Sequence, residues 1–156
     1  MSKIGKKERE TQNRVIALFR DEMKYRYLGH WESREENSNI EEDILSAYLI
    51  RKKYSPDLIG KALYEFGKTV NDQSKSLYDV NKEVYSLLRY GVTVQPEIGQ
   101  NKETVWLIDW QNPLENDFAI AEEVTINGIH KKRPDIVLYI NGIALGVLEL
   151  KRSTVS

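Results

Sequence analysis

The stretch that decides the fold is RPDIVLYINGIALGVLELK, which spans Arg133–Lys151. It contains two apolar runs separated by Asn141-Gly142, a dipeptide typical of the tight turn of a β-hairpin. The first run begins at Asp135, and the second ends with Glu149-Leu150-Lys151. Buried strands seldom carry charged residues, so these three charges at adjacent strand ends form a candidate site.

The register of this hairpin decides whether the three charges can meet. Successive strand residues point to opposite faces of a sheet, so Glu149 and Lys151 share one face. A two-residue loop would place Asp135 opposite Leu148, on the wrong face. A three-residue loop with a bulge at Gly142 would bring Asp135 to the face of Glu149. We predict the three-residue loop or an equivalent bulge.

Length and composition indicate a globular chain. Its 156 residues, 40% hydrophobic and 30% charged, suit a domain with its own core rather than a disordered segment. The net charge of −1 does not indicate a polyanionic partner. Basic residues do gather in the first 26 positions. They are consistent with a nucleic-acid-binding face or with a solvated helix face.

Several classes of site are excluded or disfavoured by composition. The absence of cysteine removes disulfides, zinc–thiolate sites and cysteine nucleophiles. His30 and His130 lie far apart, which disfavours a histidine-based metal site. No apolar run approaches the length of a membrane span and no signal-peptide core is present, so we expect a cytoplasmic protein with no membrane partner.

Apolar periodicity predicts helices first and strands second. Helices are expected over 7–27, over about 40–53 after a capping box at Ser38, from Pro56 after a Ser55 cap, and over 76–90 with Gly91 as the stop. Residues 28–37 are expected to be irregular, and strands are expected at 92–94, 103–110, 117–126 and in the hairpin. The pattern predicts an α+β fold, with a helical part at about 7–90 and a mixed, mostly antiparallel sheet at about 92–151.

The hairpin charges suit metal-assisted hydrolysis if they converge. The carboxylates of Asp135 and Glu149 and the backbone carbonyl of Leu150 would form an open, oxygen-only site of the kind that Mg²⁺ prefers. The cation would lower the pKa of a bound water and polarise a phosphoryl oxygen, and Lys151 would orient the water or stabilise negative charge on the phosphate. An ordinary Glu149–Lys151 ion pair, with Asp135 capping a turn, is the simpler alternative for so short a motif.

The residues around these charges resemble one family closely. Pro134-Asp135, a hairpin and then Glu149-Leu150-Lys151 resemble the PD-(D/E)XK nuclease superfamily. The segment 141–151 is similar to the N-terminal nuclease domain of the restriction (R) subunit of type I restriction–modification enzymes. Four further segments are similar to that family, so the resemblance covers nearly the whole chain: Thr11–Ile16, Asn37–Glu42, Leu107–Trp110 and Asn116–Ile120.

The resemblance implies a function and a set of roles. It implies a single nuclease-like domain over 1–156 at the N-terminal end of a larger protein, a type I site-specific deoxyribonuclease that cuts double-stranded DNA. Mg²⁺, an ATP-driven complex, and modification and specificity subunits are implied as cofactor and partners. Asp135, Glu149 and Lys151 match the catalytic triplet of the family. Glu41 is our candidate for the helix-borne acid that often joins such a site, although it also stands where a capping box with Ser38 would place it.

Two departures from the family pattern shape the expectation. The chain has no Gly-x-x-x-x-Gly-Lys-Ser/Thr loop, so ATP is expected to bind a motor region of the full-length family protein and not this segment. The helix that follows the Glu-x-Lys strand in the family is absent here, so we expect a truncated core with an incomplete site. The alternative function is a non-catalytic DNA-binding or subunit-docking module.

Other residues allow two interpretations each. Lys131, Lys132, Arg133 and Arg152 flank the hairpin and would hold DNA phosphates, or would act as charges that protect strand ends. The three tryptophans, Trp31, Trp106 and Trp110, could stack on bases, but we expect them in the core. Asp109 could be a second metal ligand, but a hydrogen bond to the following Asn-Pro turn is the favoured reading.

Overall fold

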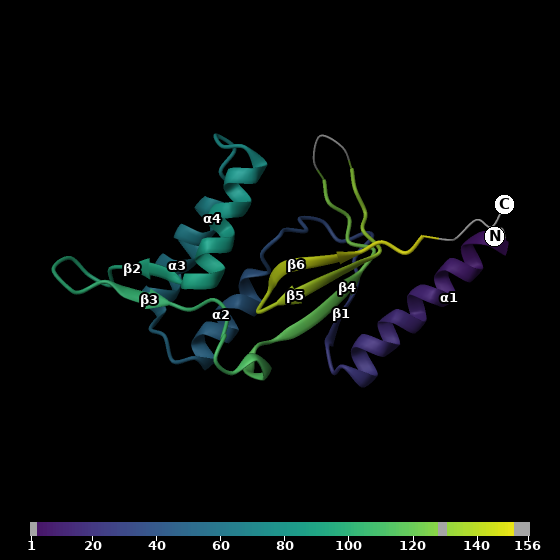
Figure 1. Ribbon diagram of the computed structural model, residues 1–156, viewed down its shortest axis with the longest axis horizontal. Helices are drawn as coiled ribbons and strands as arrows, with labels where there is room; N and C mark the ends of the chain where they lie inside the picture. The colour runs from purple at the N-terminus through teal and green to yellow at the C-terminus, as the bar shows by residue number, and fades with distance from the viewer. Residues whose placement is uncertain (1–2, 128–130, 152–156) are drawn as a thin grey trace. The chain divides into compact units, whose positions relative to one another are not determined.

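The computed structural model describes residues 3–127 and 131–151, which form two compact units (Figure 1). One unit combines the chain up to Asn39 with the chain from Asp117 onward, and the other is Ile40–Asn116. A domain can contain more than one compact unit, so the single domain over 1–156 stays a prediction. No helix in the described part of the chain is long and apolar enough to cross a membrane.

The unit formed by the two chain ends is a sheet with one long helix. Its strands lie in the order β1-β4-β5-β6, with β1 parallel to β4 and the other neighbours antiparallel. This arrangement confirms the predicted α+β class with a mixed, mostly antiparallel sheet. The elements are α1 (Lys3–Ala17), a π-helical turn η1 (Leu18–Glu22), β1 (Arg26–His30), β4 (Phe118–Glu122), β5 (Ile136–Ile140) and β6 (Ile143–Leu148).

The predicted division into a helical part and a later sheet part was wrong at β1. The four-residue spacing of apolar side chains continues from Val15 to Tyr27 and suggested one helix through that point. Instead the helix ends at Glu22, Lys24 adopts a positive φ of 61°, and the chain enters the sheet. The partner of β1 is β4, about ninety positions later, so local periodicity carries no signal for this pairing.

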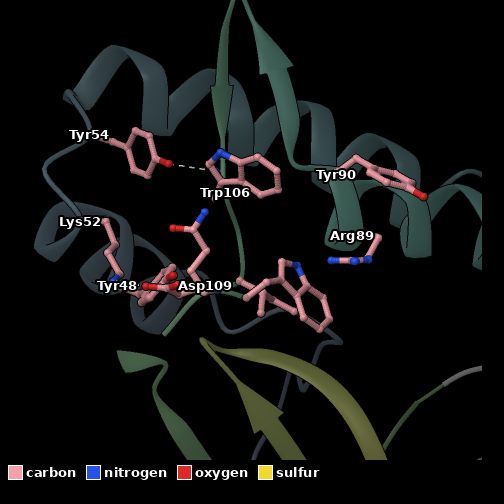
Figure 2. Close-up of a pocket in the computed structure, with 10 residues that line it drawn as sticks. Tyr48, Lys52, Tyr54, Arg89, Tyr90, Trp106 and Asp109 are labelled. Carbon is pink, nitrogen blue, oxygen red and sulfur yellow. Dashed lines mark hydrogen bonds and ion pairs between the residues drawn. The ribbon is translucent and has the colours of Figure 1, made fainter. Parts of the chain in front are cut away.

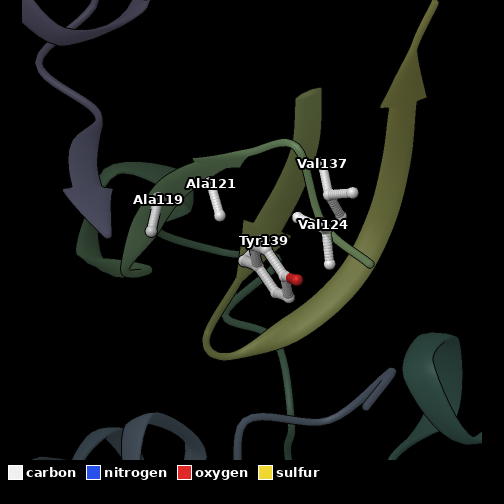
Figure 3. Packing of buried hydrophobic residues seen from close by; sticks show 5 residues of the cluster. All are labelled: Ala119, Ala121, Val124, Val137 and Tyr139. Carbon is white, nitrogen blue, oxygen red and sulfur yellow. The ribbon is translucent and has the colours of Figure 1, made fainter. Parts of the chain in front are cut away.

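The sheet buries a different set of side chains on each face. One face carries the cluster Ala119, Ala121, Val124, Val137 and Tyr139, seen close up in Figure 3. On the other face Ile120 and Ile136 pack with Ile16 of α1. Leu148 and Leu150, near the end of the hairpin, also pack on the α1 face. The sheet is therefore covered by α1 on one side only, within this unit.

The hairpin of β5 and β6 contains a bulge that shifts its register. Asn141 and Gly142 both have positive φ, 51° and 80°, as the predicted Asn-Gly turn requires, and Ile140 pairs directly with Ile143. The loop thus has two residues and not the three that we expected at Gly142. An equivalent bulge follows at Leu145, because Tyr139 pairs with Ala144 whereas the next residue, Leu138, pairs with Gly146.

The bulge restores the register that the site requires. Beyond it Val137 pairs with Val147, and Ile136 pairs with Leu148. The next position along each strand is Asp135 on one side and Glu149 on the other. The predicted bulge is therefore confirmed, with the extra residue in β6 and not in the turn. Continued by one position, this register would put Asp135 and Glu149 on one face, which stays a prediction.

The other unit contains three helices and a short two-stranded sheet. Ser55 Oγ accepts a hydrogen bond from Leu58 N at 3.3 Å, so the predicted Ser55 cap is confirmed. Ser76 Oγ accepts a hydrogen bond from Asp79 N at 3.1 Å and caps α4 in the same way. The predicted capping box at Ser38 is wrong, because α2 begins after Glu41. The elements are α2 (Glu42–Arg51), α3 (Pro56–Val70), α4 (Leu77–Tyr90), β2 (Val92–Val94), β3 (Glu103–Val105) and a 3₁₀ turn η2 (Pro113–Glu115).

Gly91 joins α4 to β2 at a crowded point. Its φ is 80°, and a Cβ atom there would lie 2.5 Å from Thr104 Cγ2 and 3.0 Å from the Val105 carbonyl oxygen. Both the backbone conformation and the close approach of β3 therefore require glycine. The stop that the sequence indicated for the helix is also a packing requirement of the small sheet.

Replacing Gly91 with alanine is expected to lower the free energy of unfolding by roughly 1–3 kcal/mol, through strain at the positive φ and overpacking against Thr104. Gly67→Ala is the matched control. Gly67 lies within α3 with nothing within 4 Å of its Cβ position, so alanine there should raise stability by up to about 1 kcal/mol. Urea unfolding followed by circular dichroism measures both. A Gly91→Ala chain as stable as the original would contradict the crowding.

Candidate functional site

The charges of the hairpin gather where β5 begins and β6 ends. Asp135 Oδ2 accepts a hydrogen bond from the backbone N–H of Leu150 at 2.6 Å. Leu148 and Leu150 pack on the α1 face, so alternation directs Glu149, which lies between them, to the opposite face. Asp135 precedes Ile136, which also packs on the α1 face, and so it shares the face of Glu149.

The side chains of this site remain available to a ligand. Glu149 and Lys151 are exposed and Asp135 is half-buried. Neither Glu149 nor Lys151 forms a hydrogen bond or ion pair with another described residue, so the simpler alternative of a Glu149–Lys151 ion pair does not hold in this structure. The alternative role of Asp135 as a turn cap is replaced by its bond to the neighbouring strand.

The donor set fits a hard divalent cation with several waters. Two carboxylates on one face, one of them exposed, supply oxygen ligands only, which suits Mg²⁺. Within 3–127 and 131–151, no three acidic, histidine or cysteine side chains come together as a metal-binding group. Asp135 and Glu149 are the side chains of the hairpin that could hold such a cation. Glu41 belongs to the other compact unit, and its role stays a prediction.

The basic residues that flank the hairpin differ in how they are engaged. Arg133 forms ion pairs with Glu32 and with Glu123, the latter at 3.0 Å between Nε and Oε2. Lys131 and Lys132 are exposed. Arg152 lies outside the described residues. The two lysines are thus better placed than Arg133 to meet a phosphate.

Asp109 has the structural role that the sequence favoured. Its Oδ1 accepts hydrogen bonds from the backbone N–H groups of Gln111 and Asn112, at 3.1 and 2.8 Å. Its Oδ2 accepts from Lys52 Nζ at 2.7 Å. The Lys52 hydrogen bond is the largest cause that holds the pKa of Asp109 below its usual value. The predicted hydrogen bond to the turn is confirmed.

The tryptophans do not share one environment. Trp31 packs against the cluster of Figure 3, with its ring centroid 5.8 Å from that of Tyr139. Trp106 and Trp110 are 44% and 45% exposed, so the expectation that they belong to the core was wrong. Both belong to the segment after β3, where the predicted strand 103–110 ends early at Val105.

Comparison with known proteins identifies the family. The model of the type I restriction enzyme R protein N terminus matches residues 5–156. The chain belongs to this family. That match includes every described residue of the hairpin and both compact units apart from the first positions of α1.

Two relatives from Methanocaldococcus jannaschii cover a smaller part of the chain. They are named "Putative type I restriction enzyme MjaIXP endonuclease subunit", 28% identical over 107 residues, and "Putative type I restriction enzyme MjaVIIIP endonuclease subunit", 29% identical over 103 residues. Each alignment covers 64% of this chain but only 10% or 9% of the relative. The chain thus spans about a tenth of the length of these relatives. No solved structure matches the chain.

One buried carboxylate, that of Glu122, was not predicted from the sequence. Glu122, the last residue of β4, is 4% exposed. It accepts hydrogen bonds from Gln12 Nε2 at 2.8 Å, from Tyr27 Oη at 2.7 Å and from Arg9 Nη1 at 3.1 Å. These partners join α1 and β1 to the end of β4. An acid at the end of the apolar run 118–121 was the one available signal.

The titration of Glu122 follows from these partners. Burial raises its pKa, but the hydrogen bonds from Tyr27, Gln12 and Arg9 outweigh burial and leave the pKa below its ordinary value of 4.5. Burial and the same carboxylate raise the pKa of Tyr27 to about 12. Glu122 is therefore ionised, and Tyr27 is its neutral donor, over the physiological range.

We expect Glu122→Gln to lower the free energy of unfolding at pH 7 by roughly 1–3 kcal/mol, because Gln12, Tyr27 and Arg9 lose a buried, charged acceptor. A carboxyl whose pKa is depressed in the folded state stabilises above its unfolded pKa, and this contribution is lost as pH falls through the folded pKa. The loss of stability as the pH falls below about 4.5 should therefore be smaller in the variant. Urea titrations at several pH values measure this. Glu8→Gln, at an exposed acid of α1, is the control; equal pH profiles for all three chains would exclude the linkage.

Proposed function

We propose that this chain is the nuclease domain of a type I restriction enzyme R subunit and hydrolyses phosphodiesters of double-stranded DNA with Mg²⁺. The observation that carries the proposal is the shifted register of β5 and β6. Continued by one position beyond its last pair, Ile136 with Leu148, this register would set Asp135 opposite Glu149. The Asp135 carboxylate accepts a hydrogen bond from the Leu150 amide. A hairpin without the bulge would separate the two acids.

The charged residues of the hairpin would have different roles in the reaction. Asp135 and Glu149 would hold the cation through their carboxylates. The backbone N–H of Leu150 donates to Asp135. In extended backbone the N–H and C=O of one residue point to the same side, so the Leu150 carbonyl would be suited to act as a third ligand. Bound Mg²⁺ supplies charge stabilisation at the phosphoryl group and a lower pKa for a coordinated water.

Lys151 would act on the phosphate directly. It follows Glu149 by two positions, is exposed, and has no carboxylate partner among the described residues. Its ammonium group would stabilise the negative charge that grows on the phosphate oxygens as water attacks phosphorus and the ester P–O bond breaks. Exposed Lys131 and Lys132 would add sequence-independent contacts to the DNA backbone.

The rest of the reaction would depend on partners. The relatives named above are called subunits of type I restriction enzymes, and this chain spans only about a tenth of their length. We propose that cleavage occurs in an ATP-driven complex in which modification and specificity subunits select the site on DNA. The ATP would bind a motor region of the full-length protein.

The test is DNA cleavage by the full R subunit assembled with its partners, with Mg²⁺ and ATP. Asp135→Asn removes a charged ligand and Lys151→Met removes the cation beside the phosphate, so each is expected to lower the cleavage rate about 10²–10³-fold. ATP hydrolysis should continue, because neither residue is proposed to touch the nucleotide. Linearisation of a supercoiled plasmid and release of phosphate from ATP give the two readouts.

Asp57→Asn and Lys68→Met in α3 are matched controls of the same charge change, at exposed positions outside the hairpin. Both should cleave as the original does. Unchanged cleavage in Asp135→Asn and Lys151→Met would remove these residues from the mechanism. If those two variants lost cleavage because they failed to assemble with the other subunits, a docking module would be the better account.

A further inference from the structure

An aromatic pocket lies in the unit Ile40–Asn116, which the proposed cleavage chemistry does not use. Its volume is about 510 Å³, within the range of roughly 300–1,000 Å³ typical of small-ligand sites. The lining includes Trp106, Trp110 and Tyr90, which are 44%, 45% and 67% exposed. Large aromatic side chains left half open to solvent around one cavity are typical of recognition of flat ligands.

Hydrogen bonds hold the two tryptophan residues that line the pocket. Trp110 Nε1 donates to the Leu88 carbonyl oxygen at 2.9 Å, which ties that ring to α4. The backbone N–H of Trp106 donates to Tyr54 Oη at 3.0 Å, the dashed line of Figure 2. The Trp106 ring is thus positioned through its backbone. A pocket ordered before binding loses less entropy when a ligand enters.

The charges of the pocket favour an anion. Lys52 is engaged by Asp109 at 2.7 Å, so these two charges balance. Arg89 lies over the Trp110 ring, 5.1 Å from its centroid, and forms no ion pair with any described residue. Figure 2 shows Lys52 and Tyr54 at one end of the pocket and Arg89 and Tyr90 at the other, with Trp106 between. The unbalanced charge is therefore the guanidinium of Arg89.

We propose that this pocket binds an unpaired nucleotide, with the base against the aromatic rings and the phosphate at Arg89. Stacking on aromatic side chains next to a cation is the usual way in which unpaired bases are held. Bases inside a duplex keep both faces stacked on their neighbours and cannot enter. A quaternary ammonium ligand, which also prefers aromatic cages, would be repelled by Arg89. The nucleotide can belong to single-stranded DNA or be free in solution.

The test uses the whole 156-residue chain and a fluorescently labelled 12-nucleotide single strand, with binding read by anisotropy. The strand should bind, and the duplex of the same sequence should bind at least about tenfold more weakly. Trp106→Ala should weaken single-strand binding about tenfold, Arg89→Gln by a similar factor, and Trp106→Phe should recover most of the loss. Competition by dAMP distinguishes a free nucleotide from single-stranded DNA as the source of the bound nucleotide. Strong competition indicates a free nucleotide, and weak competition indicates a polymer whose neighbouring phosphates contribute.

Two variants of α4 outside the pocket are the controls. Tyr85→Ala removes an exposed ring and Lys82→Gln removes an exposed cation, and neither should change binding. Circular dichroism confirms that each chain is folded, and Arg89→Gln, which truncates no buried side chain, carries the test if Trp106→Ala does not fold. Equal affinity for single strand and duplex, or equal losses in the controls, would overturn the proposal. Because binding is measured without cleavage, failure here leaves the hairpin proposal standing.

Discussion

The pairing of β5 with β6 governs what the sheet can do, and a single surplus residue controls that pairing. Between the Asn141-Gly142 turn and the strand end, β6 has one residue more than a regular ladder would use. Leu145 takes up this residue as a bulge, so the pairs beyond it are shifted by one relative to the turn. Because strand side chains alternate with a period of two, that shift exchanges the two faces of everything that follows. Without the bulge, the register would put Asp135 and Glu149 on opposite faces.

The alternation of strand side chains also places Glu122 and Asp135 in different environments. Glu122 lies on the side of α1, where Arg9, Gln12 and Tyr27 satisfy its oxygens. Those hydrogen bonds connect α1 and the edge strand β1 to β4, a central strand of the sheet. Asp135, on the other side, has one backbone N–H as its partner. Arg9 donates twice, so Glu122 accepts four hydrogen bonds, which fills the roughly four acceptor sites of a carboxylate. Asp135 keeps acceptor sites that a ligand could use.

The sequence predicted the features that depend on short-range chemistry. The Asn-Gly turn, the Ser55 cap of α3 and the glycine stop at 91 are all set by residues within a few positions of each other, and each is confirmed. The sequence also predicted that a bulge must exist, since the charges could share a face in no other way. It could not locate that bulge, because a surplus residue can be placed at several points of a strand at similar cost.

Features set by distant partners were missed because residues close in the sequence carry no signal for those partners. β1 forms a strand because β4 offers it a parallel edge, although its own apolar spacing continues that of the helix. Glu122 is structural because three residues from α1 and β1 reach it.

Trp106 and Trp110 are the most informative case, because size and hydrophobicity both favour a buried position. In the folded chain the Trp106 backbone N–H donates to Tyr54 Oη, and the Trp110 indole N–H donates to the Leu88 carbonyl oxygen. The bond of the Trp110 indole holds that ring at the pocket, and no pattern in the nearby sequence signals either bond. The chain thus keeps costly aromatic surface in contact with water, and this cost would be offset if a flat ligand covered the rings.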